Sequence, residues 1–339
     1  MHEFRYRLWV ILSVLLTVSC VHEYPEDYGG IDPTEIDTKI TLRTEQKFTH
    51  TSIASSRAEE SFDFMYFIVE LHEDEYGATP LFRREIGVQK FLDGSAAIEL
   101  HEKLHAGHYK CVAYAMAANS TDGTGRIFQT SDLSNIGYSG SYPGNTDAKE
   151  CYETRFDIDL SPSEWYASTE VTNLLNTPMG SVEVISTDVN EFIQNEISRN
   201  EANAAPGDDT RVDLWQWDDY YIVWKYDQYY PVRYNLYTGL PNQALREVSF
   251  RATIVPQSDT EASLGFDYIF VNGQTSQVSL TLEVYDKNNT RLNVYSGIKV
   301  PIERGRTTVI RGEYLTNRQE SGVGIDPGFD GDISVELPD

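Results

Sequence analysis

Three residues in the first third of the chain have the types and spacing of a zinc hydrolase site. His101, Glu102 and His105 match His-Glu-x-x-His, in which both His bind zinc and the Glu acts as general base. That chemistry requires a helix, so that the two imidazoles share one face, and a third ligand further along the chain. Residues 95–117 instead have the pattern of a strand, a turn at Gly107 and a second strand. We therefore expect a solvated hairpin loop, with no metal and no cofactor.

No other constellation offers a catalytic centre. All seven His lie within the first 108 residues, so a Ser-His-Asp arrangement cannot be formed convincingly. Asp326, Asp330 and Asp332 lack the twelve-residue spacing and the closing Glu of a calcium loop, and we expect solvated turn acids there. The sequence assigns no catalytic residue, and the chain is not expected to be an enzyme.

The elements that position these residues are predicted to be strands. Residues 62–71 and 109–117 are apolar on both faces, as in central strands. Alternating apolar and polar residues predict further strands at 40–44, 155–160, 248–254 and 278–284, with the dipeptide Asn272-Gly273 marking a hairpin before the last of them. One helix is expected at 186–202, where Val189, Phe192, Ile193 and Ile197 share a face and Asp188 with Glu191 resembles a capping box. The fold class is therefore all-β with one short helix.

The length and the turn signals predict two domains. A chain of 339 residues exceeds one hydrophobic core, since domains commonly hold about 150 residues. Strands at this spacing indicate two β-sandwiches in series, and the loop after the helix is taken as their junction. We expect an N-terminal domain at 38–203 and a C-terminal domain at 210–339.

The N-terminus has the pattern of an exported, lipidated protein. Arg5 and Arg7 precede an apolar run at 8–18 that is too short to span a bilayer, which is typical of a signal peptide. Ser19 then precedes Cys20, an order that resembles the lipobox of bacterial lipoproteins, although Thr17 stands where those proteins usually have Leu. We expect residues 1–19 to be removed by cleavage between Ser19 and Cys20, and Cys20 to carry lipid. The alternative is a secretory peptide cut nearby, with Cys20 left as a free thiol.

Residues 20–37 combine Pro, Gly and acid without periodicity, which predicts a tether. Glu23, Glu26 and Asp27 resemble the signal that sends lipoproteins of Bacteroidetes to the outer surface. The expected location is therefore the outer face of the outer membrane. The formal charge of −26 excludes a nucleic-acid groove, because phosphate binding requires clustered Lys and Arg.

Two further features allow two interpretations each. Cys111 and Cys151 could form a disulfide between neighbouring strands or stay as two buried thiols. The aromatic stretch 215–230 could hold a sugar or peptide on Trp215 or Trp217, or its side chains could pack a strand into the core. We favour core packing for the aromatic stretch.

Several stretches resemble the fimbrillin-type subunits of the type V pili of Bacteroidetes. The resemblance begins at the lipoprotein start and continues through four segments: LHAGHYKCVAYAMA (104–117), TPMGSVEVISTDVNEFI (177–193), YDQYYPVRYNLYTGLPNQALREVSFRATI (226–254) and GVGIDPGFDGDISVELP (322–338). It implies two transthyretin-like sandwiches in a surface fimbria, with other fimbrial subunits as partners through strand exchange. A donated strand needs one apolar face, which Ile333, Val335 and Leu337 provide.

The same resemblance implies an arginine-specific maturation cut after the first strand in stalk and tip subunits, whereas anchor subunits keep their lipid. Arg43 and Arg57 are the matching candidates, and Arg57 lies in the more polar stretch. Because neither has a strong cleavage context, the sequence favours a minor, anchor-like or accessory subunit. The alternative function is a surface glycan-binding lipoprotein that uses an exposed Trp.

Overall fold

The computed structural model describes residues 34–45, 62–76, 79–162, 168–203, 215–317 and 332–336, with backbone alone in the last range. Ser19, Cys20, Arg57 and Leu337 therefore lie outside the described residues or side chains. None of the helices in those ranges has the length and apolar character needed to cross a membrane.

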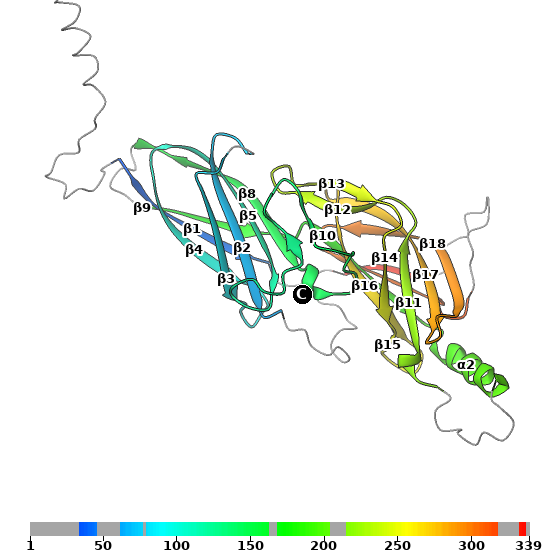
Figure 1. The fold of residues 1–339 in the computed structure, drawn as a ribbon. Helices are drawn as coiled ribbons and strands as arrows, with labels where there is room; N and C mark the ends of the chain where they lie inside the picture. Colours follow the sequence, from blue (N-terminus) through cyan, green and yellow to red (C-terminus); the bar gives the residue numbers. More distant parts are fainter. Residues whose placement is uncertain are drawn as a thin grey trace, which may run out of the picture.

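The first sandwich combines a three-stranded and a four-stranded sheet (Figure 1). The three-stranded sheet has the order β4-β1-β9, with β1 at Ile36–Thr44, β4 at Ala97–Leu104 and β9 at Ser168–Leu175. The four-stranded sheet has the order β3-β2-β5-β8, with β2 at Phe64–Glu73, β3 at Phe82–Gln89, β5 at Gly107–Ala118 and β8 at Cys151–Leu160. Side chains from both sheets, including Ile40, Phe67 and Ile158, enclose one apolar core.

The second sandwich has a five-stranded and a four-stranded sheet. The five-stranded order is β15-β16-β10-β19-β20, with β10 at Met179–Ser186, β15 at Val255–Pro256, β16 at Ala262–Phe270, β19 at Thr307–Gly312 and β20 at Asp332–Glu336. The four-stranded order is β14-β11-β17-β18, with β11 at Tyr220–Tyr226, β14 at Ser249–Thr253, β17 at Thr275–Asp286 and β18 at Arg291–Glu303. The core between them includes Val184, Trp224 and Leu282, and helix α2 (Val189–Asn203) adds Val189 and Phe192 to it.

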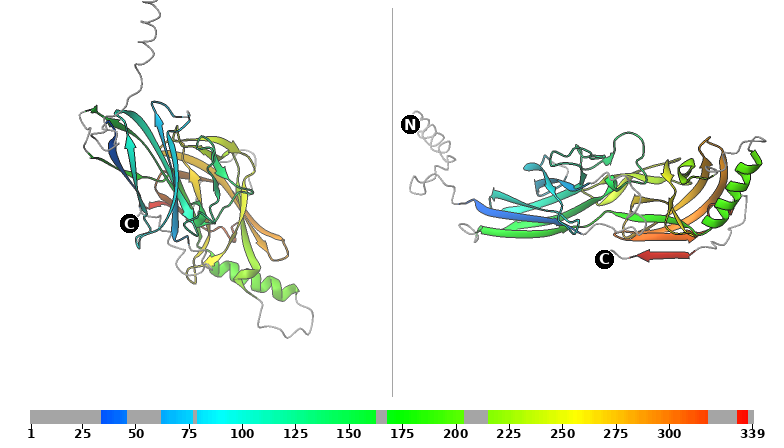
Figure 2. Two further views of the ribbon diagram at one scale, coloured as in Figure 1. Left: turned by 60° about the vertical axis from the view of Figure 1, so that its left-hand side comes forward. Right: turned by 90° about the horizontal axis from the view of Figure 1, so that it is seen from below.

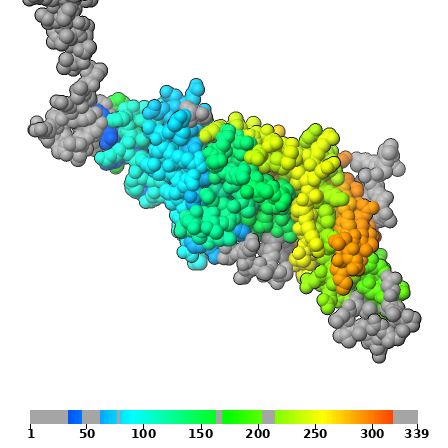
Figure 3. Space-filling view, in the orientation of Figure 1, coloured from blue at the N-terminus to red at the C-terminus, as the bar shows by residue number. Residues whose placement is uncertain are grey.

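A further sheet joins the two halves of the chain. Its order is β13-β12-β7-β6, with β6 at Phe128–Gln129, β7 at Ile136–Tyr138, β12 at Tyr230–Asn235 and β13 at Leu240–Leu245. A third apolar cluster lies beside it and takes Tyr114 from β5, Tyr234 from β12 and Phe270 from β16. Figure 3 shows the segment after β5, in green, between the cyan and yellow parts of the molecule. The two sandwiches therefore share buried apolar surface.

Sheet membership differs from the division expected near residues 203–210. β10 precedes that junction, yet it pairs with β16 and β19 of the second sandwich. Residues 204–214, where the junction was expected, lie outside the described residues, and we place the change of sandwich between β9 and β10. The physical reason is that α2 buries Val189 and Phe192 in the second core.

The expected strand and helix types are confirmed. β2 and β5 are central strands, and the helix pattern becomes α2. One local expectation differs. Asn272-Gly273 connects β16 to β17 in different sheets and is no hairpin, although Gly273 has the positive φ of 85° that such a turn needs. The Asp188 carboxylate accepts hydrogen bonds from the backbone of Leu315 and Thr316, so it fixes the chain after β19.

Candidate functional site

β1 lies between two strands that do not bond to each other. It pairs antiparallel with β4 and parallel with β9, so that Ile40 faces Leu100 on one side and Val171 on the other. Ile36, Ile40 and Leu42 are fully buried. Burial of each such side chain contributes about 1.5–3 kcal/mol. A strand in this position completes the sheet and also fills an apolar slot. We use the term β1 slot for the space between β4 and β9.

The strand begins earlier than expected, because Ile36 and Asp37 of the predicted tether already pair with β4. Its other end is fixed by the turn before β4. The amide of Thr44 donates to the carbonyl of Ala96 at 2.9 Å, and the amide of Ala96 donates to Oγ1 of Thr44 at 2.9 Å. These bonds close the slot at the end from which the chain runs on to Arg57.

Arg43 lies inside β1. Its backbone is in register with Ala97 of β4 and Leu174 of β9, and its guanidinium approaches the Asp93 carboxylate at 3.4 Å. Proteases cleave exposed loops in preference to paired strands. Cleavage after Arg43 would therefore require the end of β1 to leave the sheet first. Arg57, the other candidate, lies outside the described residues.

β20 forms the outer edge of the five-stranded sheet. It runs antiparallel to β19, with Ile333 in register with Ile310 and Val335 in register with Thr308. Figure 2 shows β20, in red, on the outer side of the second sandwich. The candidate donor strand is thus paired with its own chain in this state.

The residues of the zinc-like motif do not share one face, because two of them are adjacent in a strand. The predicted strand–turn–strand is confirmed, because β4 ends at Leu104 and β5 begins at Gly107. His101 and Glu102 are neighbours in β4 and so point to opposite faces. Glu102 accepts two hydrogen bonds from Arg84, at 3.0 and 3.1 Å. Among the described residues, no group of three His, Cys, Asp or Glu could hold a metal ion.

The possible disulfide is contradicted, since Cys111 and Cys151 are both free and buried. In the β5–β8 pairing, Cys111 faces Phe156 and Cys151 faces Met116. An offset of five positions separates the two thiols by about 16 Å along the strands and puts them on opposite faces. A disulfide requires Cα atoms within about 7 Å. The alternative interpretation, two buried thiols, is therefore correct.

We predict that neither thiol reacts with a thiol reagent in the native protein at pH 8. Burial raises the pKa of both Cys111 and Cys151 to about 12, so the reactive thiolate is almost absent at that pH. Titration with Ellman's reagent should give less than about a tenth of one thiol per chain when native and two in denaturant. The assay uses protein without Cys20, and rapid native labelling would contradict the buried placement.

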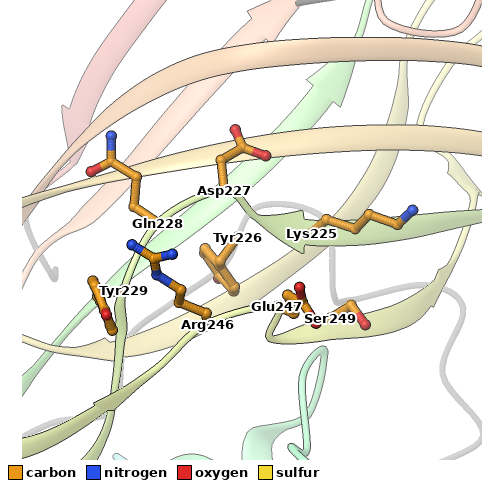
Figure 4. A pocket seen from close by; sticks show the side chains of 8 residues that line it. All are labelled: Lys225, Tyr226, Asp227, Gln228, Tyr229, Arg246, Glu247 and Ser249. Carbon is orange, nitrogen blue, oxygen red and sulfur yellow. The ribbon is translucent and has the colours of Figure 1, made fainter.

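A surface hollow of about 820 Å³ was missed by sequence reasoning (Figure 4). Two turns line it, one between β11 and β12 and one between β13 and β14, with the residues Lys225, Tyr226, Asp227, Gln228, Tyr229, Arg246, Glu247 and Ser249. Figure 4 shows Gln228, Tyr229 and Arg246 grouped at one end of the hollow. Tyr229 is 64% exposed, and the Arg246 guanidinium lies 4.5 Å from the centre of its ring. An exposed ring with planar polar groups suits a hydroxyl-rich ligand.

The structure also buries a charged pair that the sequence did not indicate. Nζ of Lys149 lies 2.7 Å from Oδ1 of Asp267, and both side chains have no exposed surface. Lys149 ends the short 3₁₀ helix Asp147–Lys149 before β8, whereas Asp267 is on β16. Charged side chains are almost never fully buried unless they are paired, and the pair lies more than a hundred positions apart in sequence.

Residues 32–338 match the model of a family of unknown function, DUF6562. The chain belongs to this family. No curated protein matches this DUF6562 sequence.

Solved structures that resemble the DUF6562 chain include two from species of Bacteroides and one from Porphyromonas gingivalis. A candidate cell adhesion protein from Bacteroides ovatus has a TM-score of 0.47 and 12% identity, and the match covers 89% of this chain and 96% of that chain. A candidate polysaccharide-binding protein from Bacteroides thetaiotaomicron has a TM-score of 0.44 and 9% identity, with 82% and 91% covered. The fimbrial anchor protein Mfa2 from Porphyromonas gingivalis has a TM-score of 0.38 and 10% identity, with 82% and 90% covered.

The aromatic stretch of the DUF6562 protein packs against its own helix. Trp215 stacks on Tyr220 with 4.8 Å between ring centres and meets Phe192 of α2 edge-on at 5.6 Å. Trp217 is half-buried against Trp215. Farther along β11, Trp224 is fully buried and donates its indole N–H to the carbonyl of Leu264. The favoured core-packing interpretation therefore accounts for these rings.

Proposed function

We propose that the chain is a structural subunit of a cell-surface fimbria that joins its neighbours by strand exchange. Its role is that of a minor, anchor or accessory subunit, held at the outer membrane by lipid on Cys20. The single observation that carries the proposal is β1, which bonds to β4 and β9 on its two sides and buries Ile36, Ile40 and Leu42.

Loss of β1 would leave two unpaired strand edges around an apolar slot. Such edges readily accept a strand from another chain, because main-chain hydrogen bonds supply affinity and alternate side chains supply specificity. A natural occupant is the C-terminal strand of a second subunit, which carries Ile333, Val335 and Leu337. In this structure β20 pairs with β19 of its own chain, and donation would require it to leave that edge.

The pairing of β1 makes Arg43 and Arg57 differ as candidate cleavage sites. A cut after Arg57 would leave the whole strand intact and held only by non-covalent contacts. A cut after Arg43 would have to occur within a strand that is paired on both sides. We therefore assign Arg57 as the site of maturation in any copy that polymerises. An anchor keeps β1 and its lipid.

The test exposes the full chain to an arginine-specific protease and follows the products by N-terminal sequencing and by gels in SDS. We expect a new terminus at Ala58, followed by SDS-resistant multimers after brief exposure to mild denaturant. Arg57→Ala should prevent both changes, and Arg43→Ala should prevent neither. A synthetic peptide of residues 36–44 should occupy the slot and lower the yield of multimers at least tenfold.

A peptide with Ile40→Asp is the matched control, because it places a charge in the apolar slot and should have no effect. A trimmed chain that stays monomeric and ignores the wild-type peptide would refute strand exchange. Lipidation is checked separately by mass spectrometry of the mature N-terminus, where an unmodified Cys20 would refute the anchor.

A second candidate function is glycan binding at the surface. The hollow in Figure 4 is a better candidate binding site for a glycan than Trp215 or Trp217. Tyr229 is exposed, whereas Trp215 and Trp217 pack against the core. Binding to a polysaccharide array that is lost in Tyr229→Ala and kept in Trp217→Ala would support this function. If no polysaccharide on the array binds the protein, glycan binding is refuted.

A further inference from the structure

The contacts of Lys149 and Asp267 have the geometry of a reactive pair. Nζ of Lys149 donates to Oδ1 of Asp267 at 2.7 Å, to the carbonyl of Tyr268 and to the hydroxyl of Tyr142. The Tyr142 hydroxyl in turn donates to Oδ2 of Asp267 at 2.5 Å. One hydroxyl therefore touches the amine and the carboxyl group at the same time.

The carboxyl group is held by further donors. Oδ1 of Asp267 accepts from the backbone N–H of Tyr268 at 3.0 Å. Oδ2 accepts from the hydroxyls of Tyr226 at 2.6 Å and Tyr230 at 3.2 Å. The rings of Tyr138 and Tyr142 lie 5.2 and 4.3 Å from Nζ. The pair is thus fixed in an aromatic, buried site.

The geometry points to an intramolecular isopeptide bond between Nζ of Lys149 and Cγ of Asp267. In its formation the ammonium loses two protons and the carboxylate loses Oδ2, which leave together as water, while one C–N bond forms. The positive and negative charges cancel, and no oxidant or other reactant is needed. Water is the only product besides the amide.

Each contact has a part in this reaction. Tyr142 can take a proton from Nζ while it passes its own to Oδ2, which produces the neutral amine and neutral acid that condense. The N–H of Tyr268 stabilises the charge that develops on Oδ1, and the hydroxyls at Oδ2 assist the departure of water. The fixed contact of amine and carboxyl group removes the entropic cost of bringing them together.

Burial favours the same outcome. Desolvation lowers the pKa of the Lys149 ammonium despite the opposing charge of Asp267, so the attacking neutral amine is more accessible than in water. Desolvation also raises the pKa of the Tyr142 hydroxyl well above its usual value, which keeps it protonated as a relay. Because the site is closed to solvent, bulk water has no access to the amide to reverse the condensation.

The bond would join the two sandwiches covalently. Lys149 precedes β8 of the first sandwich and Asp267 is on β16 of the second. The linkage would close a loop of more than a hundred residues and restrict the unfolded chain accordingly. This inference does not depend on strand exchange or on lipidation.

The test is a tryptic map of the reduced, denatured full-length protein. A covalent bond blocks cleavage after Lys149, so residues 127–155 should appear joined to residues 252–287, lighter than their sum by one water molecule. Recovery of free 127–149 and free 252–287 in full yield would overturn the proposal, because an ion pair does not survive denaturation. The wild-type map decides the matter without any variant.

The same digest contains a matched control. Lys90 and Glu150 form a buried pair at the same 2.7 Å, but the described contacts show no hydroxyl that touches both groups. Trypsin should cleave normally after Lys90. In Tyr142→Phe, which keeps the ring and lacks the relay, the fraction of joined peptide should fall at least tenfold. An unchanged fraction in a folded variant would remove Tyr142 from the mechanism and overturn its assigned role.

Discussion

Replacement of Lys149 by Met is expected to lower the free energy of unfolding by about 3–5 kcal/mol. The substitution leaves the Asp267 carboxylate fully buried without its cation, and hydrogen bonds from tyrosines only partly replace that charge. The loss arises whether the native pair is ionic or covalently joined, since either state compensates the charge of Asp267. Urea unfolding followed by tryptophan fluorescence measures it.

Lys225→Met is the matched control. Nζ of Lys225 lies 2.6 Å from the Glu283 carboxylate, which is as close as the buried pair, but the Lys225 side chain is 45% exposed. Exposed ion pairs contribute about 0–1 kcal/mol, because water and salt screen them. Equal losses in Lys149→Met and Lys225→Met would contradict the burial of the first pair.

The second large effect is a loss of stability at alkaline pH. Burial raises the pKa of Cys111 and Cys151 to about 12, and it raises the pKa of Tyr142, Tyr226 and Tyr230 well above the usual value. In the unfolded chain these groups lose their protons near pH 9 for Cys and pH 10 for Tyr. Between those values and the folded pKa values, the unfolded state is the one that ionises.

The sign of the effect follows from proton binding. The contribution of these groups to the unfolding free energy is fully present below about pH 9. It falls as the pH rises further, because the folded state then binds more protons than the unfolded state. Each such group lowers the unfolding free energy by about 1.4 kcal/mol per pH unit, so three of them lower it by about 4 kcal/mol per unit. The lowered pKa of Lys149 acts in the opposite direction, but it is one group against several.

Urea unfolding at intervals from pH 7 to pH 11 tests this expectation, with tyrosinate absorbance as the second signal. A step in tyrosinate absorbance should accompany the unfolding transition above about pH 10, because the buried hydroxyls ionise only when the chain unfolds. A stability that stays level to pH 11, or an unfolding transition without such a step, would show that these hydroxyls are open to solvent.

The local structure could be predicted from sequence because it depends on neighbouring residues. The alternation of Val248, Phe250 and Ala252 identified β14, and the shared face of Val189 and Phe192 identified α2. Both patterns report which face of an element is buried. They contain no information on which other strand covers that face.

Strand pairing and the sites therefore escaped prediction. β10 was assigned to the first sandwich because it precedes the predicted junction after the helix, yet its hydrogen-bonded neighbours are β16 and β19. The Lys149–Asp267 pair was not predicted, since nothing close in sequence marks either residue as buried. The hollow of Figure 4 combines two turns that are separated by β12 and β13.

The position of β1 has a mechanical consequence. If lipid on Cys20 holds the chain, tension from the membrane enters the folded part at Ile36 and acts along the axis of β1. The strand would then be loaded in shear, so that its bonds to β4 and β9 must break together and not one after another. An intact β1 is thus a strong point of attachment, whereas a chain cut after Arg57 would part from its tether at this strand under load.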